Sequence, residues 1–600
     1  MQNKTFRAIG ATAVLLGVAV AALAQVGPDD PSATETAPEV TVGASTTVAA
    51  TTTVVAPSDY RLGLLAGITT DNFWEYIGDQ PTVWNAYVLG PTKPSLFGID
   101  PVSNALIQDL SAEEDVEPTS DADGWRVRVE IEAGLTWSDG EPITARDIVY
   151  TFDTVRRLGL QGGWEVAFPA EIEEIVADSD TQVRIELSKR PSLAVWPYGI
   201  GLAPIMPAHV WAPRTDPLQT AAALYELDGA GDVSGGPLQI DAVEEQRILS
   251  VANPAYSRPT PDTVTYSIYP DEASAVAALE AGEIDTVVSP NGLSAESIAS
   301  LESADGVSIE QSPANSIRYL GFNLTREPMS APAFRQALSL LLDREAATQS
   351  VVPDASAAYT MLSPANVQWF DPEQAAAIAG AFDGDLPERL SKVIGLLQAD
   401  GYAWATPPSA VDGALSPGRG LTIDGQAPAP LTILTPGDEY DPARPDYTQR
   451  IEATLQAFGF EVSSVITDFD TVIDLAFTVD DSGVRQYDMY VLGWTLGNPA
   501  RPDFYRFLFA SDGTVNSTGY SDAEFDAQLA RYEQATNVEE AKAALWEMEK
   551  TLAEDIPYLV LYHPDLFEAY RSDRLDFAHH GVLGGLQGRL GGIGDLTPAR

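Results

Sequence analysis

The chain of 600 residues, 45% of them hydrophobic, is too long for a single hydrophobic core, because cores stop growing near about 250–300 residues. We therefore expect at least two lobes. Acidic residues outnumber basic residues 87 to 34, and the formal charge of -53 repels nucleic acid phosphates and anionic lipids, which disfavours both as partners. Cysteine is absent, which excludes disulfides and thiolate metal ligands.

The N-terminus has the pattern of a secretory signal. Lys4 and Arg7 precede an apolar run over residues 8–23, and small residues close the run at Ala24. We expect a signal peptide at 1–24 that is cleaved after Ala24, with an uncleaved membrane anchor as the alternative. Either form exports the rest of the chain to the periplasm or to the outer face of the cell membrane.

A linker separates this segment from the folded part of the chain. Residues 25–57 are mainly Thr, Ala, Val, Pro and Asp, and such a composition cannot build a core, so it predicts a disordered linker. Folding is expected to begin near Tyr60. Strand-like and helix-like segments alternate from there on, which indicates an α/β chain.

The clearest structural unit lies between residues 125 and 155. Apolar and charged residues alternate over 125–131, the pattern of a strand with one buried face. Asp139 and Gly140 then predict a turn, and Thr144 with Asp147 can cap a helix. The order is strand, turn, helix.

Two further units combine a strand and a helix. Residues 317–324 form an apolar strand, followed by a helix from near Ser330. Its half-buried face consists of Phe334, Ala337, Leu338, Leu341 and Leu342. Residues 447–458 predict a helix that Gly459 ends, and 461–466 predict the next strand.

The sequence lacks the common catalytic motifs. There is no nucleophile elbow, no phosphate-binding P-loop and no H-E-x-x-H zinc helix, so we expect neither enzymatic activity nor a cofactor. Of the four histidines only His579 and His580 are adjacent, and a metal site is not expected. Carboxylate pairs such as Glu173 and Glu174 are so numerous that an extracellular glycan hydrolase stays open as an alternative.

Six segments, read in chain order, carry a family resemblance. They are L-T-W-S-D-G-E-P-I-T-A-R-D at 135–147, S-G-G-P-L at 234–238, G-E-I-D at 282–285, G-F-N at 321–323, F-R-Q-A-L at 334–338 and Y-D-M-Y-V-L-G-W at 487–494. They resemble segments of the extracellular solute-binding proteins of family 5, the peptide/nickel class with its oligopeptide- and dipeptide-binding members. The resemblance covers roughly residues 58–575.

The resemblance implies an α/β, two-lobed periplasmic-binding-protein-like fold of type II, in the large class with an extra subdomain. Lobe 1 would comprise residues 58–315 with an inserted subdomain at about 75–210, and lobe 2 would comprise 316–486. Residues 487–600 would return to lobe 1 and end in a C-terminal tail. A hinge at the crossovers would close a cleft between the lobes.

The resemblance also implies ligand-binding residues. Trp494 of the G-W strand is expected to contact the ligand, with Asn498 and Arg501 just beyond it. Phe469 falls where family members place an aromatic side chain at the cleft, and Trp164 is a further candidate from the subdomain. Family members that bind peptides hold the ligand's ammonium group with an aspartate three residues after this tryptophan, and here Gly497 takes that position.

The resemblance, together with the secretory signal, implies the substrate-binding component of an ABC importer. It would capture a peptide or peptide-sized solute by hinge closure and deliver it to the permease subunits of the transporter. An oligosaccharide is the alternative ligand, and a sensor or adhesin that lost its transporter is an alternative role. We expect a monomer that contacts the membrane only through the permease or through an uncleaved N-terminal anchor.

Overall fold

The computed structural model describes residues 58–121, 124–229, 231–353, 355–438, 440–441, 443–479 and 485–599. The expected signal peptide at 1–24 and linker at 25–57 lie outside the described residues. Within the described part of the chain, no helix combines the length and the apolar character needed to cross a membrane.

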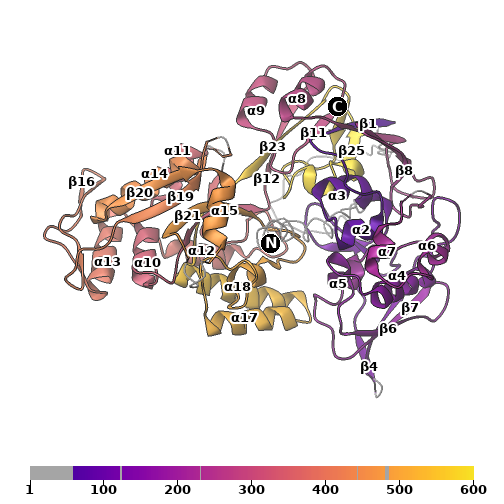
Figure 1. Cartoon of the computed structure of the whole chain (residues 1–600), viewed down its shortest axis with the longest axis horizontal. Coiled ribbons are helices and arrows are strands. Elements are labelled where there is room, and N and C mark those ends of the chain that lie inside the picture. The colour runs from indigo at the N-terminus through magenta and orange to yellow at the C-terminus, as the bar shows by residue number, and fades with distance from the viewer. Residues whose placement is uncertain are drawn as a thin grey trace, which may run out of the picture.

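Lobe 1 is built on a seven-stranded sheet, seen at the upper right of Figure 1. In spatial order its strands are β12 (Ser308–Pro313), β23 (Asp565–Tyr570), β11 (Thr286–Val288), β1 (Asp59–Leu64), β10 (Thr263–Ile268), β9 (Arg247–Ala252) and β8 (Leu238–Glu244). Helices α8 (Glu272–Glu280) and α9 (Ala295–Leu301) pack against β11 and β23. The sheet therefore joins segments from the beginning, the middle and the end of the chain.

The subdomain of lobe 1 has its own four-stranded sheet in the order β4-β5-β7-β6. The elements between β1 and β8 are α2 (Phe73–Gly78), α3 (Val83–Leu89), β2 (Phe97–Ile99), β3 (Leu106–Gln108), β4 (Thr119–Asp121), β5 (Gly124–Glu130), α4 (Ala145–Leu158), α5 (Gly163–Ala167), β6 (Ile172–Ala177), β7 (Gln182–Leu187), α6 (Ala208–Thr215) and α7 (Ala221–Tyr225). Figure 1 shows β4, β6 and β7 at the opposite end of lobe 1 from β1.

Lobe 2 is built on a six-stranded sheet that lies beside lobe 1 in Figure 1. Its strands in spatial order are β14 (Ser356–Ala357), β22 (Tyr558–His563), β13 (Ser316–Phe322), β21 (Met489–Thr495), β19 (Leu431–Pro436) and β20 (Val462–Thr467). Its helices are α10 (Pro332–Leu341), α11 (Arg344–Val351), α12 (Pro372–Gly380), α13 (Leu386–Ala399), α14 (Ala443–Phe458), α15 (Phe469–Phe477), α16 (Phe504–Phe509), α17 (Ala523–Gln534) and α18 (Val538–Asp555).

Short strand pairs complete both lobes. In lobe 2 these are β15 (Tyr402–Ala403) with β18 (Thr422–Ile423), and β16 (Ser409–Val411) with β17 (Ala414–Ser416). In lobe 1, β24 (Leu575–Phe577) pairs with β25 (Leu596–Pro598). Because β25 lies near the end of the chain, this last pair holds the C-terminal segment, residues 578–599, in lobe 1.

The strand, turn and helix expected at 125–155 are confirmed. In β5, Val127 and Val129 are fully buried while Arg128 between them is exposed, because alternate side chains of a strand face opposite sides. Helix α4 starts after Thr144, whose backbone N–H donates to the Asp147 carboxylate at 2.8 Å. The helix thus begins where the capping residues predict.

The two other expected units are also present, with shifted boundaries. The strand expected at 317–324 is β13, and its helix α10 begins at Pro332, two residues after Ser330. The helix expected at 447–458 is α14, which begins at Ala443. Its four extra residues include Arg444, whose buried side chain pairs with Asp441.

The chain crosses between the lobes twice. It passes from β12 to β13 through Ala314 and Asn315, and it returns from β22 to β23 through Pro564. The return to lobe 1 was expected at residue 487, but β21 and β22 pair with the two edges of β13 and so belong to lobe 2.

Candidate functional site

Two cavities lie between the lobes, and they meet at the end of β21. The larger has a volume of about 430 Å³ and the smaller of about 130 Å³. Thr495 and Gly497 line both. Because lobe 1, lobe 2 and the crossovers all contribute walls, a molecule bound here would contact every part that a hinge motion displaces.

The larger cavity is enclosed by the crossovers and by the C-terminal segment. The crossovers contribute Asn315 and Pro564, and lobe 2 contributes Arg318. The C-terminal segment contributes Leu583, Gly584, Gln587, Gly588, Arg589 and Leu590. From the sequence these last residues were expected only in a C-terminal tail, whereas in the tertiary structure they form a wall of the cavity.

The smaller cavity lies between the subdomain and lobe 2. The subdomain contributes Ala194 and Tyr198, and lobe 2 contributes Trp494, Phe504 and Phe507. Aromatic side chains supply broad apolar contact with few rotatable bonds. This cavity is therefore suited to an apolar part of a ligand.

Trp494 is the penultimate residue of β21. Its ring stands edge-to-face to Phe477 at a centroid distance of 5.7 Å, and its indole N–H points to the Tyr558 hydroxyl at 3.4 Å. The ring is half-buried and lines the smaller cavity. Part of the ring is therefore exposed at the wall of this cavity.

Asn498 and Arg501 line the same cavity. The side-chain carbonyl of Asn498 accepts a hydrogen bond from the backbone N–H of Ala500 at 2.9 Å. Arg501 is 6% exposed, forms an ion pair with Asp503, and lies over the Tyr532 ring with its guanidinium carbon 5.0 Å from the centroid. The charge of Arg501 is thus already neutralised.

Phe469 and Trp164 lie outside the lining of both cavities. Phe469 begins α15 and stacks on Tyr440, with a centroid distance of 4.2 Å and an angle of 13°. Trp164 is fully buried in the subdomain, where its indole N–H donates to the backbone carbonyl of Trp74 at 2.9 Å. The placement of Trp164 corrects the expectation of a ligand contact, because its hydrogen bond and its packing serve the core.

Gly497 connects the cavities to the hinge. Its backbone carbonyl accepts a hydrogen bond from the side-chain amide of Asn315 at 2.7 Å, and its φ of 74° lies in the left-handed region that favours glycine. The glycine that replaces the family's aspartate therefore has a conformational role here. A carboxylate is absent from this position, and the amide of Asn315 occupies the neighbouring space.

Arg318 is a cavity residue that the sequence analysis missed. It lies in the central strand β13, and its Nε donates to the Asp441 carboxylate at 3.2 Å. Arg444 donates to the same carboxylate oxygen at 2.9 Å, and burial together with the charge of Arg318 lowers the pKa of Arg444. The available signal was a charged residue inside an otherwise apolar strand.

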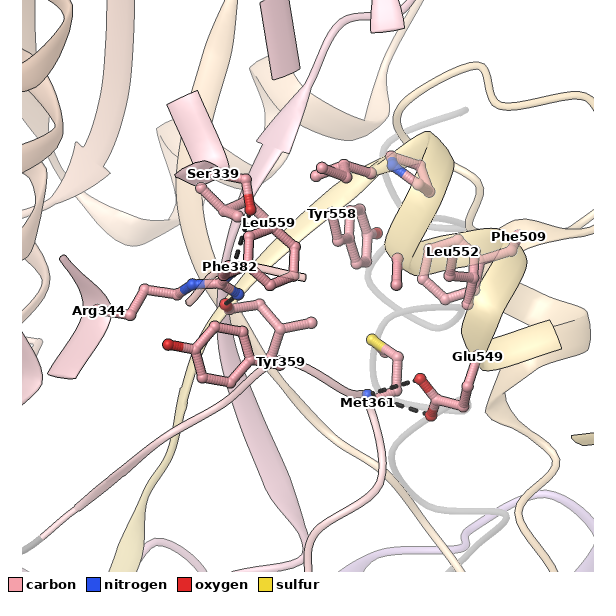
Figure 2. Close-up of a pocket in the computed structure, with 14 residues that line it drawn as sticks. Ser339, Arg344, Tyr359, Met361, Phe382, Phe509, Glu549, Leu552, Tyr558 and Leu559 are labelled. Atoms are coloured by element: carbon pink, nitrogen blue, oxygen red, sulfur yellow. Dashed lines mark hydrogen bonds between the residues drawn. The ribbon is translucent and has the colours of Figure 1, made fainter. Parts of the chain in front are cut away.

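A further, small cavity of about 20 Å³ lies in lobe 2, and Figure 2 shows its lining. Glu549 accepts hydrogen bonds from the backbone N–H groups of Met361 and Leu362, each at 3.1 Å, and burial raises its pKa. Arg344 donates to the carbonyl of Ala358 at 3.0 Å, and burial lowers its pKa to about 10. The two side chains hold residues 358–362 against lobe 2, which is a structural role.

The histidines interact with carboxylates. His579 contacts Asp595 at 2.7 Å, and His580 lies 3.2 Å from Glu310 and 3.1 Å from Asp576. No group of three or more potential ligand side chains is arranged to hold a metal ion in the part of the chain that the structure describes.

Comparison with known proteins identifies the family. The family model for bacterial extracellular solute-binding proteins, family 5, middle region, matches residues 108–516. The oligopeptide-binding protein AppA of Bacillus subtilis is 23% identical over 460 residues, covering 75% of this chain and 78% of AppA. The dipeptide-binding protein of Escherichia coli is 22% identical over 475 residues, covering 75% of this chain and 80% of the relative.

The solved structures show the same fold. The substrate-binding protein CtaP of an ABC transporter from Listeria monocytogenes superposes with a TM-score of 0.68 at 18% identity, covering 91% of this chain and all of CtaP. The two-lobed periplasmic-binding-protein-like fold expected from the sequence is thereby confirmed. This protein belongs to the bacterial extracellular solute-binding proteins of family 5.

Proposed function

We propose that this protein is the substrate-binding component of an ABC importer, which captures a peptide or peptide-sized solute outside the membrane and delivers it to the permease. The observation that carries the proposal is the pair of joined cavities, whose walls come from both lobes and from the crossovers. A larger cavity of about 430 Å³ is in the range of small-molecule sites.

Capture follows from the position of the hinge. Ala314, Asn315 and Pro564 are the only described residues between the strands of the two sheets at the crossovers, so rotation there changes the separation of the lobes. A ligand that contacts both lobes binds the closed state better than the open state and shifts the equilibrium towards it. No chemical step is required, and the ligand leaves unchanged.

The relatives support a peptide as the ligand. Their names describe an oligopeptide-binding and a dipeptide-binding protein. The aromatic wall formed by Trp494 and Phe504 suits apolar side chains of a peptide, whereas the usual aspartate for the ammonium group is replaced by Gly497. The proposed ligand is therefore a peptide or a peptide-sized solute. Groups other than an aspartate at position 497 would hold it.

A ligand screen tests the proposal. The purified protein is mixed with pools of peptides of two to ten residues, with oligosaccharides or with metal chelates, and its melting temperature is measured. Peptides are expected to raise the melting temperature in a concentration-dependent manner, because they bind only the native state. Mass spectrometry of the released ligand should show intact peptide. Stabilisation by glycans alone, followed by their cleavage, would contradict transport and favour a hydrolase.

A further inference from the structure

Asn104 has an incomplete set of hydrogen bonds at the wall of the larger cavity. It belongs to the loop that joins β2 to β3 in lobe 1, and it lines this cavity. The residue is 3% exposed, and its side-chain nitrogen is buried without a hydrogen-bond partner among the described residues. A buried amide that makes no hydrogen bond destabilises the folded protein. A ligand that occupies the cavity is in a position to supply the missing partner.

The loop holds Asn104 in one place. Its backbone N–H donates to the carbonyl of Asp100 at 2.9 Å, and the N–H of Asp100 donates to the carbonyl of Ala105 at 2.8 Å. The carboxylate of Asp100 accepts hydrogen bonds from the backbone N–H of Ser103 at 2.6 Å and from its hydroxyl at 2.7 Å. The side chain of Asn104 is therefore fixed at the cavity wall before a ligand arrives.

The backbone conformation alone does not account for an asparagine here. The φ of Asn104 is 59°, in the left-handed region that both asparagine and glycine adopt. Glycine would serve the loop without placing an amide in a buried position. Asp412, with a φ of 52° in the turn between β16 and β17, is exposed, so water can satisfy its side chain. The side chain of Asn104 thus has a cost that its loop does not require.

The wall around Asn104 favours an uncharged polar group of the ligand. Both arginines that line the cavity, Arg318 and Arg589, form ion pairs with Asp441 and Asp595. Besides Asn104, three more carboxamide side chains line the cavity, those of Asn291, Asn315 and Gln587. Carboxamides donate and accept hydrogen bonds without carrying charge. The hydrogen bonds that the wall leaves incomplete therefore belong to a neutral group.

We infer that the side chain of Asn104 hydrogen-bonds amide groups of the captured solute. This inference rests on the proposed function, and it names the chemical group that lobe 1 recognises. A carboxamide carries a donor and an acceptor, and a half-turn about the Cβ–Cγ bond exchanges their places. An extended peptide presents the N–H and the C=O of one residue on the same side, so the two partners can form two hydrogen bonds.

The position of Asn104 also couples this contact to closure. Asn104 lines the cavity from lobe 1, whereas Thr495 lines it from lobe 2. A ligand that Asn104 holds and that also contacts Thr495 touches both lobes. Such a ligand favours the closed state, because only that state offers both sets of contacts.

Backbone esters test the inference. The probe is a pool of peptides of two to ten residues built from Ala, Leu and Phe, and equilibrium dialysis with mass spectrometry measures the affinity of each. Every peptide that binds is compared with analogues in which one backbone amide at a time is an ester, which removes the N–H donor. We expect one ester position to weaken binding about 2- to 12-fold, the loss of one hydrogen bond. In Asn104→Gly this ester should bind as well as its parent peptide, because the side chain that accepts from the N–H is gone.

The same variant separates recognition from a role in the loop. Asn104→Gly keeps a residue suited to positive φ, so the protein should fold, but its affinity for the parent peptide should fall about 2- to 12-fold for each hydrogen bond lost. Asp412→Gly changes another residue with positive φ outside the cavity lining, and it should keep both the affinity and the ester effect. Unchanged affinity in Asn104→Gly would mean that the asparagine serves only the loop, and the inference would be overturned.

The outcomes separate the inference from the proposed function. If peptides bind and Asn104→Gly shows the same ester effect as the unchanged protein, the inference is overturned and peptide capture stands. If no peptide of the pool binds, the proposed ligand class fails, and two sugar probes decide the inference. Oligomers of N-acetylglucosamine carry amides, whereas cellooligosaccharides do not. Preferential binding of the former that Asn104→Gly weakens supports the inference, whereas equal binding of both, or binding of neither, overturns it.

Discussion

The side-chain amide of Gln368 in lobe 2 donates a hydrogen bond to the hydroxyl of Tyr198 in the subdomain at 2.6 Å. Close by, the backbone N–H of Leu193 donates to the carbonyl of Ala535 at 2.8 Å. Both bonds join the two lobes at the edge of the smaller cavity, to which Tyr198 belongs. They are contacts that an opening motion has to break.

Tyr198→Phe is therefore expected to speed up ligand release. The variant loses one hydrogen bond between the lobes, worth about 0.5–1.5 kcal/mol, so the dissociation rate should rise about 2- to 12-fold. Stopped-flow fluorescence measures this rate. Tyr150→Phe, which loses a 2.9 Å hydrogen bond to Thr215 inside the subdomain, should release the ligand at the unchanged rate. Equal rates in the two variants would contradict a role of Tyr198 in closure.

Trp494→Ala should weaken ligand binding by about 1–3 kcal/mol, the range for an aromatic side chain in the centre of an interface. The ring is half-buried at the smaller cavity, so the fold should persist and the melting temperature of the free protein should change little. Calorimetric titration gives the affinity. Trp125→Ala, a half-buried tryptophan of the subdomain sheet, is the control. A collapse of the melting temperature with unchanged affinity would assign Trp494 to the core.

Glu549→Ala should lower the free energy of unfolding of lobe 2 by about 2–4 kcal/mol, because the backbone N–H groups of Met361 and Leu362 lose their acceptor in a buried place. Figure 2 shows the backbone N–H of Met361 donating to both oxygens of the Glu549 carboxylate. Urea unfolding measures the loss. Glu547→Ala removes an exposed carboxylate from the same helix and should have little effect. Similar losses in both variants would refute the role given to Glu549.

Glu568 should make the stability fall as the pH rises. Burial, with the charge of Glu310 adding to it, raises the pKa of Glu568 from 4.5 to about 7. The folded state then binds more protons than the unfolded state, so the stabilisation is complete below about pH 4.5 and is lost as the pH rises through about 7. The amount is about 3.4 kcal/mol at most.

The variant Glu568→Gln isolates this effect. It cannot titrate, so its melting temperature should approach that of the unchanged protein, or exceed it, as the pH is raised from 5 to 8. The exposed residue Glu173 offers a control, since Glu173→Gln should follow the unchanged protein at every pH. A constant difference between Glu568→Gln and the unchanged protein over this range would show that Glu568 does not titrate there.

The sequence by itself determined the local elements and the family. The strand and helix around Val127 and Thr144 follow from alternation and capping, which act between near neighbours in the chain. Trp494 was assigned to the cleft by its place in a family motif, and the structure puts its ring at the smaller cavity. Trp164 could not be assigned in this way, since the same aromatic side chain suits a core and a ligand site equally well.

Only the tertiary structure decided which distant residues share a wall. The return to lobe 1 occurs at Pro564 because β22 pairs with β13, and pairing across the chain leaves no local signal in the sequence. The same holds for Arg318 and Arg444. They lie more than 120 positions apart in the chain, yet both pair with the carboxylate of Asp441. Two guanidinium groups meet at Asp441 because ion pairs depend on distance in space and not along the chain.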